Sequence, residues 1–168
     1  MKFLLAQINP VVGDLEGNAK KILCTASKAS SNSADLVLTP ELSLWGYPAN
    51  DLLLKKNLIK NQYQILDQLA LDIYKKHGNL SITVGIAEII NDSFFPNLYN
   101  SVALLEHGEW KIIARKIILP TYEVFDEKRY FRSEEKVSVL IKQIKNKTWR
   151  LGFTICEDLW VNKNIEGR

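Results

Sequence analysis

Cysteine, histidine and long apolar runs are scarce in this sequence of 168 residues. It contains two cysteines and two histidines, too few cysteines for a framework of several disulfides. The apolar run at its start is too short for the hydrophobic core of a signal peptide. No stretch approaches the roughly 20 apolar residues that a membrane helix needs. These absences predict a protein of the reducing cytoplasm that has no membrane partner.

An excess of one charge sign is also lacking. The sequence has 22 Lys and Arg against 19 Asp and Glu, a net charge of +3, and these charges are scattered rather than gathered in a basic stripe. The charge therefore gives no reason to expect a nucleic-acid partner. Hydrophobic residues make up 46% and charged residues 24%, which is typical of a globular domain with a packed core. We predict no metal site.

The apolar segments of the first half predict an α/β domain. A buried strand over residues 2–8 precedes a helix over 19–30, which an Asn in the connecting loop can cap, and a short strand covers 35–39. The order strand, helix, strand is the α/β signature. Apolar residues at helical spacing over 51–76 predict one long helix or two helices end to end.

The second half changes to a strand-rich pattern after Gly78. Three apolar or alternating runs, LSITVGIAEI, LYNSVALLE and EWKIIARKI, are joined by turn signals and predict consecutive antiparallel strands. A polar, aromatic-rich loop covers roughly 119–135. Two further strands, KVSVLI and TWRLGFTI, follow with KQIKNK between them.

Glu41 is the first candidate for chemistry, in the segment TPELSLWGYP over residues 39–48. A carboxylate directly after an apolar strand lies at the carboxyl end of that strand, where α/β proteins bind ligands. Glu41 is therefore a candidate general base. An arbitrary glutamate is more often an exposed loop acid, so Glu41 alone decides nothing.

Cys156 ends the apolar strand of WRLGFTICEDLW, and two carboxylates follow it directly. A thiol at a strand-to-loop turn can be exposed as a nucleophile, although a cysteine ending a strand is more often a small core residue. The acidic neighbours should raise the pKa of this thiol, so a base or cation must come from elsewhere in the chain.

The usual base for a thiol is histidine, but His77 and His107 lie in turn-like contexts that predict solvated loop residues. A papain-type Cys-His enzyme is therefore a poor fit. The other cysteine, Cys24, lies on the predicted amphipathic helix beside Ile22 and Leu23 and is expected to pack. Lys116 is the remaining candidate, at the end of an apolar strand before an aromatic loop. A lone lysine is ordinarily a surface charge, but a buried ammonium there can hold a carboxylate base and stabilise an oxyanion.

Together these segments place Glu41, Lys116 and Cys156 in that chain order, each at the end of an apolar strand. The order resembles the nitrilase superfamily of carbon-nitrogen hydrolases, whose catalytic triad is Glu-Lys-Cys with an acidic residue directly after the cysteine. Further segments resemble one branch, the glutaminase domains of glutamine-dependent NAD⁺ synthetases. They are Gly46-Tyr47-Pro48, Asp51 to Leu54, Tyr99-Asn100-Ser101, Leu119-Pro120, Tyr122 with Val124 to Glu127, Arg129 to Phe131 and Ile155 to Trp160. Thr121 departs from the branch, which often has Asn there.

The resemblance implies a nitrilase-type four-layer α-β-β-α sandwich, truncated after the nucleophile strand, with both helices on one face of a sheet. In the family the glutaminase domain continues past that strand, and an ATP-dependent synthetase domain follows. We therefore interpret residues 1–168 as the N-terminal portion of a glutaminase domain from which the synthetase domain is absent. Without the later strands a sheet edge should be unpaired and an apolar face exposed. We expect such a chain to aggregate or associate, and to be a poor or inactive glutaminase alone.

The resemblance also implies a reaction, the release of ammonia from L-glutamine through a thioester. Glu41 would take the proton of Cys156, the thiolate would attack the side-chain carboxamide, and Lys116 with a backbone N–H near Glu157 would stabilise the oxyanion. The ammonia would serve the amidation of deamido-NAD⁺ by the synthetase domain.

Other roles follow from the same resemblance. Tyr122, Phe125 and Glu157 are implied as substrate-binding residues, and Glu127 as a second acid near the triad. The glutaminase reaction would need no cofactor, whereas ATP and Mg²⁺ would belong to the synthetase domain. That domain and L-glutamine are the implied partners, and a homo-oligomer is implied for the full-length protein.

Two alternatives remain open at this stage. One is a stand-alone amidase of the same superfamily, acting on an aliphatic amide or carbamoyl compound without a synthetase. The other is an inactive truncated fragment that keeps an assembly surface but cannot close its active site.

Overall fold

The computed structural model describes residues 1–91 and 94–160. Its main element is a five-stranded sheet in the order β1-β2-β3-β4-β5. The strands are β1 (Phe3–Leu5), β2 (Leu36–Leu38), β3 (Ser81–Ile89), β4 (Leu98–Glu106) and β5 (Glu109–Arg115). β1, β2 and β3 pair in parallel, and β3, β4 and β5 pair antiparallel. A hairpin of β6 (Ser138–Ile144) and β7 (Lys147–Phe153) forms a second, separate sheet.

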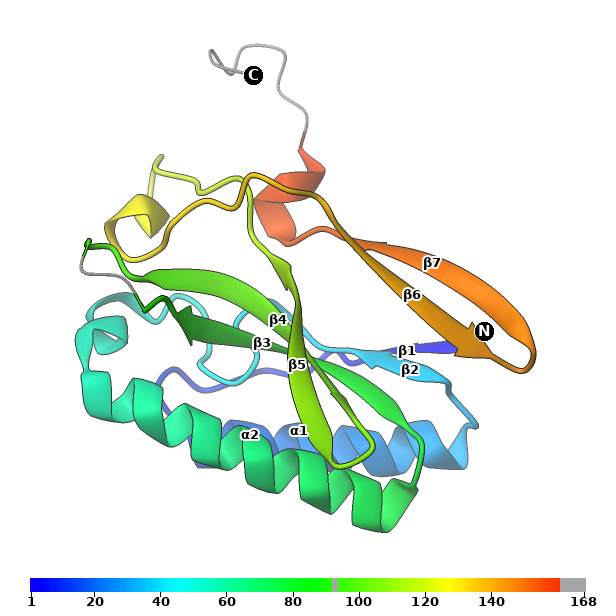
Figure 1. Ribbon diagram of the computed structural model, residues 1–168. Coiled ribbons are helices and arrows are strands. Elements are labelled where there is room, and N and C mark those ends of the chain that lie inside the picture. Colours follow the sequence, from blue (N-terminus) through cyan, green and yellow to red (C-terminus); the bar gives the residue numbers. More distant parts are fainter. Residues whose placement is uncertain (92–93, 161–168) are drawn as a thin grey trace.

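Three layers follow from this arrangement. The helices α1 (Leu15–Ser31) and α2 (Lys56–His77) lie side by side on one face of the five-stranded sheet, and the β6–β7 hairpin lies over the opposite face (Figure 1). The α/β class and the two helices on one sheet face are as predicted. No second helical layer lies within residues 1–91 and 94–160, so the described chain shows the layers α, β and β of the expected sandwich.

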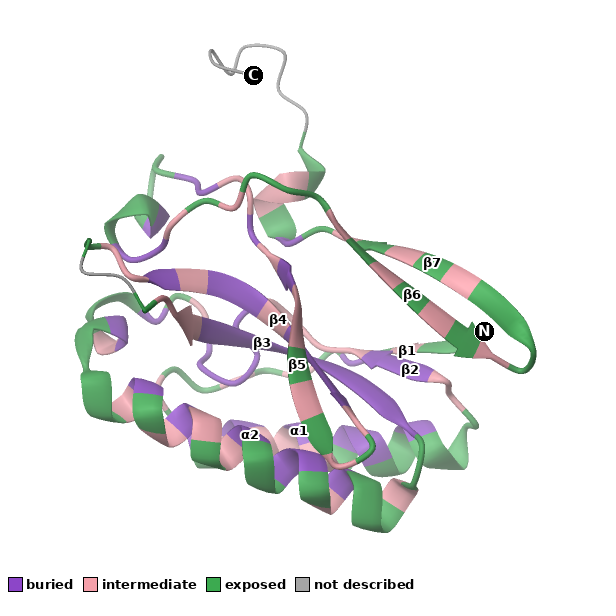
Figure 2. Cartoon of the chain, viewed as in Figure 1, coloured by how far each residue is buried: buried purple, intermediate pink, exposed green. Residues whose placement is uncertain are grey.

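The core lies between the two helices and the sheet. Each helix buries one stripe of side chains, visible as alternating bands in Figure 2, and the sheet contributes apolar residues from the same face. Among its fully buried members are Ile22, Leu66, Ile73, Ile82 and Ile86. Since burying one such side chain contributes about 1.5 to 3 kcal/mol, this layer makes the sheet a firm platform for the loops at its ends.

The predicted start of the chain needs two corrections. The strand expected over residues 2–8 is only Phe3–Leu5 and is not buried, because β1 is an edge strand whose outer side chains Phe3 and Leu5 are 45% and 69% exposed. The first helix begins at Leu15 rather than at residue 19. Its cap is the Asp14 carboxylate, which accepts from the N–H of Gly17 at 2.9 Å.

Later boundaries also shifted. The long apolar segment is two helices end to end, the short 3₁₀ helix η1 (Asn50–Leu54) and then α2, which was one of the two predicted forms. The KQIKNK segment, expected between the last two strands, belongs mostly to them, because β6 ends at Ile144, β7 begins at Lys147 and only residues 145–146 form the turn. The expectation that Cys24 packs is wrong. Its side chain is exposed on the outer side of α1.

An apolar surface is exposed on the hairpin, as expected. Val139 and Ile141 project from the outer face of β6 and are 49% and 66% exposed. Phe3 and Leu5 on β1 are exposed apolar side chains as well. Where such side chains form a contiguous patch, the patch ordinarily marks an interaction site. The association expected from this exposure stays a prediction. Within the described residues, no helix has the length and apolar character needed to cross a bilayer.

Candidate active site

Glu41 lies in a tight turn that packs directly onto β3. A side-chain Cβ at Gly85 would lie 2.3 Å from the backbone nitrogen of Leu42, so only glycine allows this approach. The Ser43 hydroxyl accepts from the N–H of Gly85 at 2.9 Å, and the N–H of Leu44 donates to the Gly85 carbonyl at 3.1 Å. Two strands therefore fix the position of Glu41, the one that precedes it and β3.

Lys116 follows the last residue of β5 and is 1% exposed. Its Nζ donates to Oε1 of Glu41 at 2.6 Å and to Oε1 of Glu127 at 2.8 Å. Burial lowers the pKa of this ammonium, but the charge of Glu41 and the hydrogen bonds to both carboxylates outweigh burial, and the pKa is raised overall. Lys116 is therefore a charged, buried group held between two acids.

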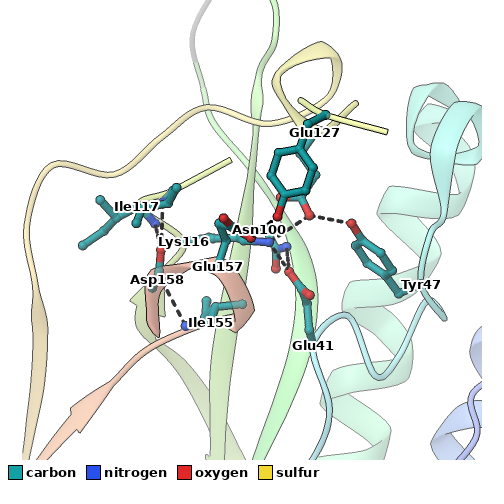
Figure 3. A network of polar contacts seen from close by, with 11 residues as sticks. Glu41, Tyr47, Asn100, Lys116, Ile117, Glu127, Ile155, Glu157 and Asp158 are labelled. Carbon is teal, nitrogen blue, oxygen red and sulfur yellow. Dashed lines mark hydrogen bonds and ion pairs between the residues drawn. The ribbon is translucent and has the colours of Figure 1, made fainter. Parts of the chain in front are cut away.

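Glu127 opens the 3₁₀ helix η2 (Glu127–Arg129) and is 4% exposed. Its Oε1 accepts from the Tyr47 hydroxyl at 2.7 Å in addition to Lys116. Burial raises the pKa of this carboxyl, and Lys116 opposes the rise. The same burial, with the hydrogen bond to Glu127, raises the pKa of Tyr47. The expected second acid beside the triad is therefore in direct contact with the lysine (Figure 3).

Asn100 of β4 completes the support of Glu41. Its side chain is buried, and its Nδ2 donates to Oε1 of Glu41 at 2.7 Å. Its backbone carbonyl accepts from the N–H of Lys116 at 2.8 Å. One residue of β4 thus contacts both the acid and the lysine of the predicted triad.

Cys156 begins the 3₁₀ helix η3 (Cys156–Leu159) directly after β7 and its short extension. Its φ of +47° lies in the left-handed region that a non-glycine residue rarely adopts, a strained turn typical of exposed nucleophiles. Burial by its surroundings raises the pKa of the thiol even though the side chain is accessible, and the charge of Glu41 and a hydrogen bond with it add to the rise. The main opposing effect is the charge of Lys116.

A cavity of about 190 Å³ opens at this point between the main sheet and the hairpin. Glu41 and Cys156 both line it, with Gly85, Val102 and Phe153 among its other walls. This volume suits a small side-chain amide better than a drug-sized ligand. Three larger hollows in the described part of the chain, of about 320, 620 and 630 Å³, lie elsewhere and include none of Glu41, Lys116 and Cys156.

The residues predicted to bind substrate lie beside η3 and are not among the residues that line this cavity. The Tyr122 hydroxyl donates to Oε2 of Glu157 at 2.8 Å, and the rings of Tyr122 and Phe125 meet edge to face at 5.4 Å. Phe125 in turn lies 6.2 Å from the ring of Tyr47. An aromatic row therefore runs from Glu127 to Glu157.

The structure places Lys116 in contact with Glu41, and Glu41 and Cys156 on the walls of one cavity. The catalytic roles of the three residues stay a prediction. His107 is exposed in the β4–β5 turn as expected, whereas His77 ends α2 and its Nε2 lies 3.3 Å from the Ser27 hydroxyl. Three polar residues of the site had no predicted role, namely Tyr47, Asn100 and Asp158. Their only sequence signal was membership of the segments that carried the family resemblance. Among the described residues, no His, Cys, Asp and Glu group is placed to hold a metal ion.

Comparison with known proteins identifies the family of this chain. Residues 5–165 match the carbon-nitrogen hydrolase family. The chain belongs to the carbon-nitrogen hydrolase family. Its curated relatives include the glutamine-dependent NAD(+) synthetases of Synechocystis sp., 40% identical over 167 residues, and of Thermotoga maritima, 40% identical over 161 residues. These alignments cover 98% and 95% of this chain but 29% and 26% of the relatives.

Solved structures place this carbon-nitrogen hydrolase in the same fold. The glutamine-dependent NAD+ synthetase from Acinetobacter baumannii superposes with a TM-score of 0.78 at 35% identity, covering 94% of this chain and 28% of that one. An amidase from Nesterenkonia sp. superposes with a TM-score of 0.67 at 22% identity, covering 90% of this chain and 54% of that one. The predicted nitrilase-type fold is therefore confirmed. The chain spans less than a third of the length of the synthetases it matches.

Proposed function

We propose that this chain is the glutamine-hydrolysing part of a glutamine-dependent NAD⁺ synthetase. The observation that carries the proposal is that Cys156 and Glu41 share one small cavity while a buried, charged Lys116 bonds to that same glutamate. A thiol, a base and a cation in contact are the components of acyl transfer through a thioester. The similarity to synthetases supports glutamine as the amide.

The first step is activation of the thiol. Oε1 of Glu41 already accepts from Lys116 at 2.6 Å and from Asn100 at 2.7 Å, which leaves Oε2 to take the proton of Cys156. Since the pKa of the thiol is raised, little thiolate exists at neutral pH before substrate binds. The proton therefore moves to Glu41 as sulfur attacks the carboxamide carbon.

The second step is collapse of the tetrahedral intermediate. Its oxyanion is stabilised by the Lys116 ammonium and by a backbone N–H near Glu157. Glu41 returns the proton to the departing nitrogen, the C–N bond breaks, and ammonia leaves a γ-glutamyl thioester on Cys156. Water, deprotonated by Glu41, then attacks the thioester, so that glutamate and the free thiol are released.

Tyr122, Phe125 and Glu157 would extend the substrate site beyond the cavity. The Glu157 carboxylate suits the α-ammonium of glutamine as an ion-pair partner, and Tyr122 holds that carboxylate by a 2.8 Å hydrogen bond. Phe125 supplies an apolar wall for the methylenes of the substrate.

The remaining partners of the proposal lie outside this chain. The ammonia would pass to a synthetase domain that amidates deamido-NAD⁺ and uses ATP and Mg²⁺, while the hydrolysis itself needs no cofactor. A homo-oligomer in the cytoplasm fits this role.

A substrate comparison tests the proposal. We expect the protein to release glutamate and ammonia from glutamine, and to hydrolyse aliphatic amides such as butyramide and carbamoyl compounds far more slowly. Glutamate is measured with a coupled dehydrogenase and ammonia is measured in parallel. Preference for the aliphatic amide would favour the stand-alone amidase instead. No release from any amide by a folded chain would favour the inactive fragment.

Glu41→Gln should separate thiol acidity from catalysis. The negative charge of Glu41 raises the pKa of Cys156, so a neutral side chain should lower that pKa and move the pH midpoint of Cys156 alkylation by iodoacetamide downward. Glutamate release should nevertheless fall by about 10³-fold or more, because the base is lost. Alkylation is followed by mass spectrometry across pH, with Glu106→Gln as control, since Glu106 pairs with Lys111 and Lys142 away from the cavity. An unchanged or rising midpoint would contradict the assigned contact.

A further inference from the structure

Asp158 connects two parts of the site that come from different strands. Its Oδ1 accepts from the N–H of Ile117 at 3.0 Å and of Ile118 at 2.7 Å, while its Oδ2 accepts from the N–H of Ile155 at 3.0 Å (Figure 3). Ile117 directly follows Lys116, and Ile155 directly precedes Cys156. One carboxylate therefore holds the backbone on both the lysine side and the cysteine side.

A simpler role for Asp158 would be to cap its own short helix. The bond from Ile155 to Oδ2, with the reciprocal bond from the Asp158 N–H to the Ile155 carbonyl at 3.1 Å, would satisfy that role alone. The two bonds to Oδ1 have no part in it, because they come from residues 40 and 41 positions earlier in the chain. Their donors belong to the segment after β5, whose backbone N–H groups would otherwise lack this partner.

The connection matters because the turn at Cys156 is strained and its hairpin is a separate sheet. The β6–β7 hairpin has no strand pairing with the main sheet among the described residues, so its backbone ladder cannot set the distance from Cys156 to Lys116. Hydrogen bonds to a carboxylate are stronger than neutral ones, and three of them converge on Asp158.

We propose that Asp158 is a positioning residue that sets Cys156 against Lys116 and Glu41 by clamping the backbone after the lysine to the backbone before the cysteine. This inference rests on the proposed function in so far as Cys156 is the nucleophile. The role depends on the length of the side chain and on both of its oxygens, not on its charge alone.

The experiment compares Asp158→Glu and Asp158→Asn with the unaltered protein. Asp158→Glu keeps the charge but lengthens the side chain, and Asp158→Asn keeps the size but places an amide N–H₂ against one of the backbone donors. In both variants we expect kcat for glutamate release to fall on the order of 10²-fold, the effect of about 1 Å of misplacement. KM should stay within about threefold, because uniform binding is not removed.

Alkylation of Cys156 across pH gives the second readout, with Cys24 as reference in the same chain. Displacing Cys156 from Glu41 should shift the alkylation midpoint to lower pH in both variants. If Asp158 acted by charge alone, only Asp158→Asn would shift it. Thermal unfolding shows that the variants are folded. The matched control is Asp67→Asn, which neutralises a carboxylate that accepts a 2.7 Å bond from Trp110 far from the cavity.

A folded Asp158→Glu protein with an unaltered kcat and an unaltered pH midpoint of Cys156 alkylation would overturn the inference. If Asp158→Glu does not fold, the isosteric Asp158→Asn provides the same test. If the unaltered protein releases no glutamate, the proposed function fails. The alkylation of Cys156 still decides the role of Asp158 in that case.

Discussion

Replacing Cys156 by alanine should abolish glutamine hydrolysis, with a loss on the order of 10⁵-fold, because no other group in the cavity can form the thioester. The structure places this thiol on the wall of the same cavity as Glu41, so the loss should appear in kcat. Glutamate release is measured under saturating glutamine. In a protein that also carries a synthetase domain, NAD⁺ formation from added ammonia should survive, since ammonia bypasses the thiol.

Cys24→Ala is the matched control for this prediction. Cys24 is exposed on α1, on the sheet face opposite the hairpin and η3 (Figure 1), so its removal should leave hydrolysis within about twofold, as is usual for surface substitutions. Equal losses in the two variants would mean that the thiols act through stability rather than chemistry. Loss of ammonia-driven synthesis in Cys156→Ala would contradict the role as an ammonia donor.

Glu41 and Lys116 could be placed near each other because each follows an apolar strand of the main sheet, and the carboxyl ends of β2 and β5 lie at one edge of that sheet. Cys156 follows β7 of the separate hairpin, so its approach to them could not be predicted from strand order. The antiparallel pairing of β3, β4 and β5 could also be predicted, since alternating runs were joined by clear turn signals. The exposure of the β1 side chains and of Cys24 could not be predicted from the sequence. An apolar residue predicts burial only if another element covers it, and the sequence does not state which elements lie at an edge.

The supporting residues could not be predicted from local pattern. Asn100 in mid-strand and Asp158 after the cysteine act through bonds to residues 59, 40 and 41 positions away. Sequence spacing carries no information on such bonds until the strand order is known. Glu127 was expected near the triad by family resemblance, but its direct bond to Lys116 follows only from the path of the aromatic loop.

Lys116→Met should destabilise the protein as well as inactivate it. Methionine keeps the length of the side chain but leaves Glu41 and Glu127, with side chains 14% and 5% exposed, facing each other without a cation. Breaking a buried ion pair in this way costs about 3 to 5 kcal/mol. Chemical denaturation at pH 7 measures this loss. The control is Lys111→Met on β5, the strand that Lys116 follows. Lys111 is 60% exposed beside Glu106, and the cost should be below about 1 kcal/mol.

The loss of stability in Lys116→Met should depend on pH in a defined direction. Lys116 has a raised pKa, so the stability it contributes is fully present below its unfolded pKa and is lost only as the pH rises through the folded value in the alkaline range. Burial raises the pKa of Glu127 and Lys116 opposes the rise, so Lys116→Met should raise it further. The folded variant then binds a proton more tightly than the unfolded chain, and its loss of stability should shrink as the pH falls from 7 to about 5.

Adding Glu127→Gln to Lys116→Met should recover part of the lost stability at pH 7, because one uncompensated carboxylate is removed. A deficit that is independent of pH would mean that packing around residue 116, rather than its charge, holds the site together.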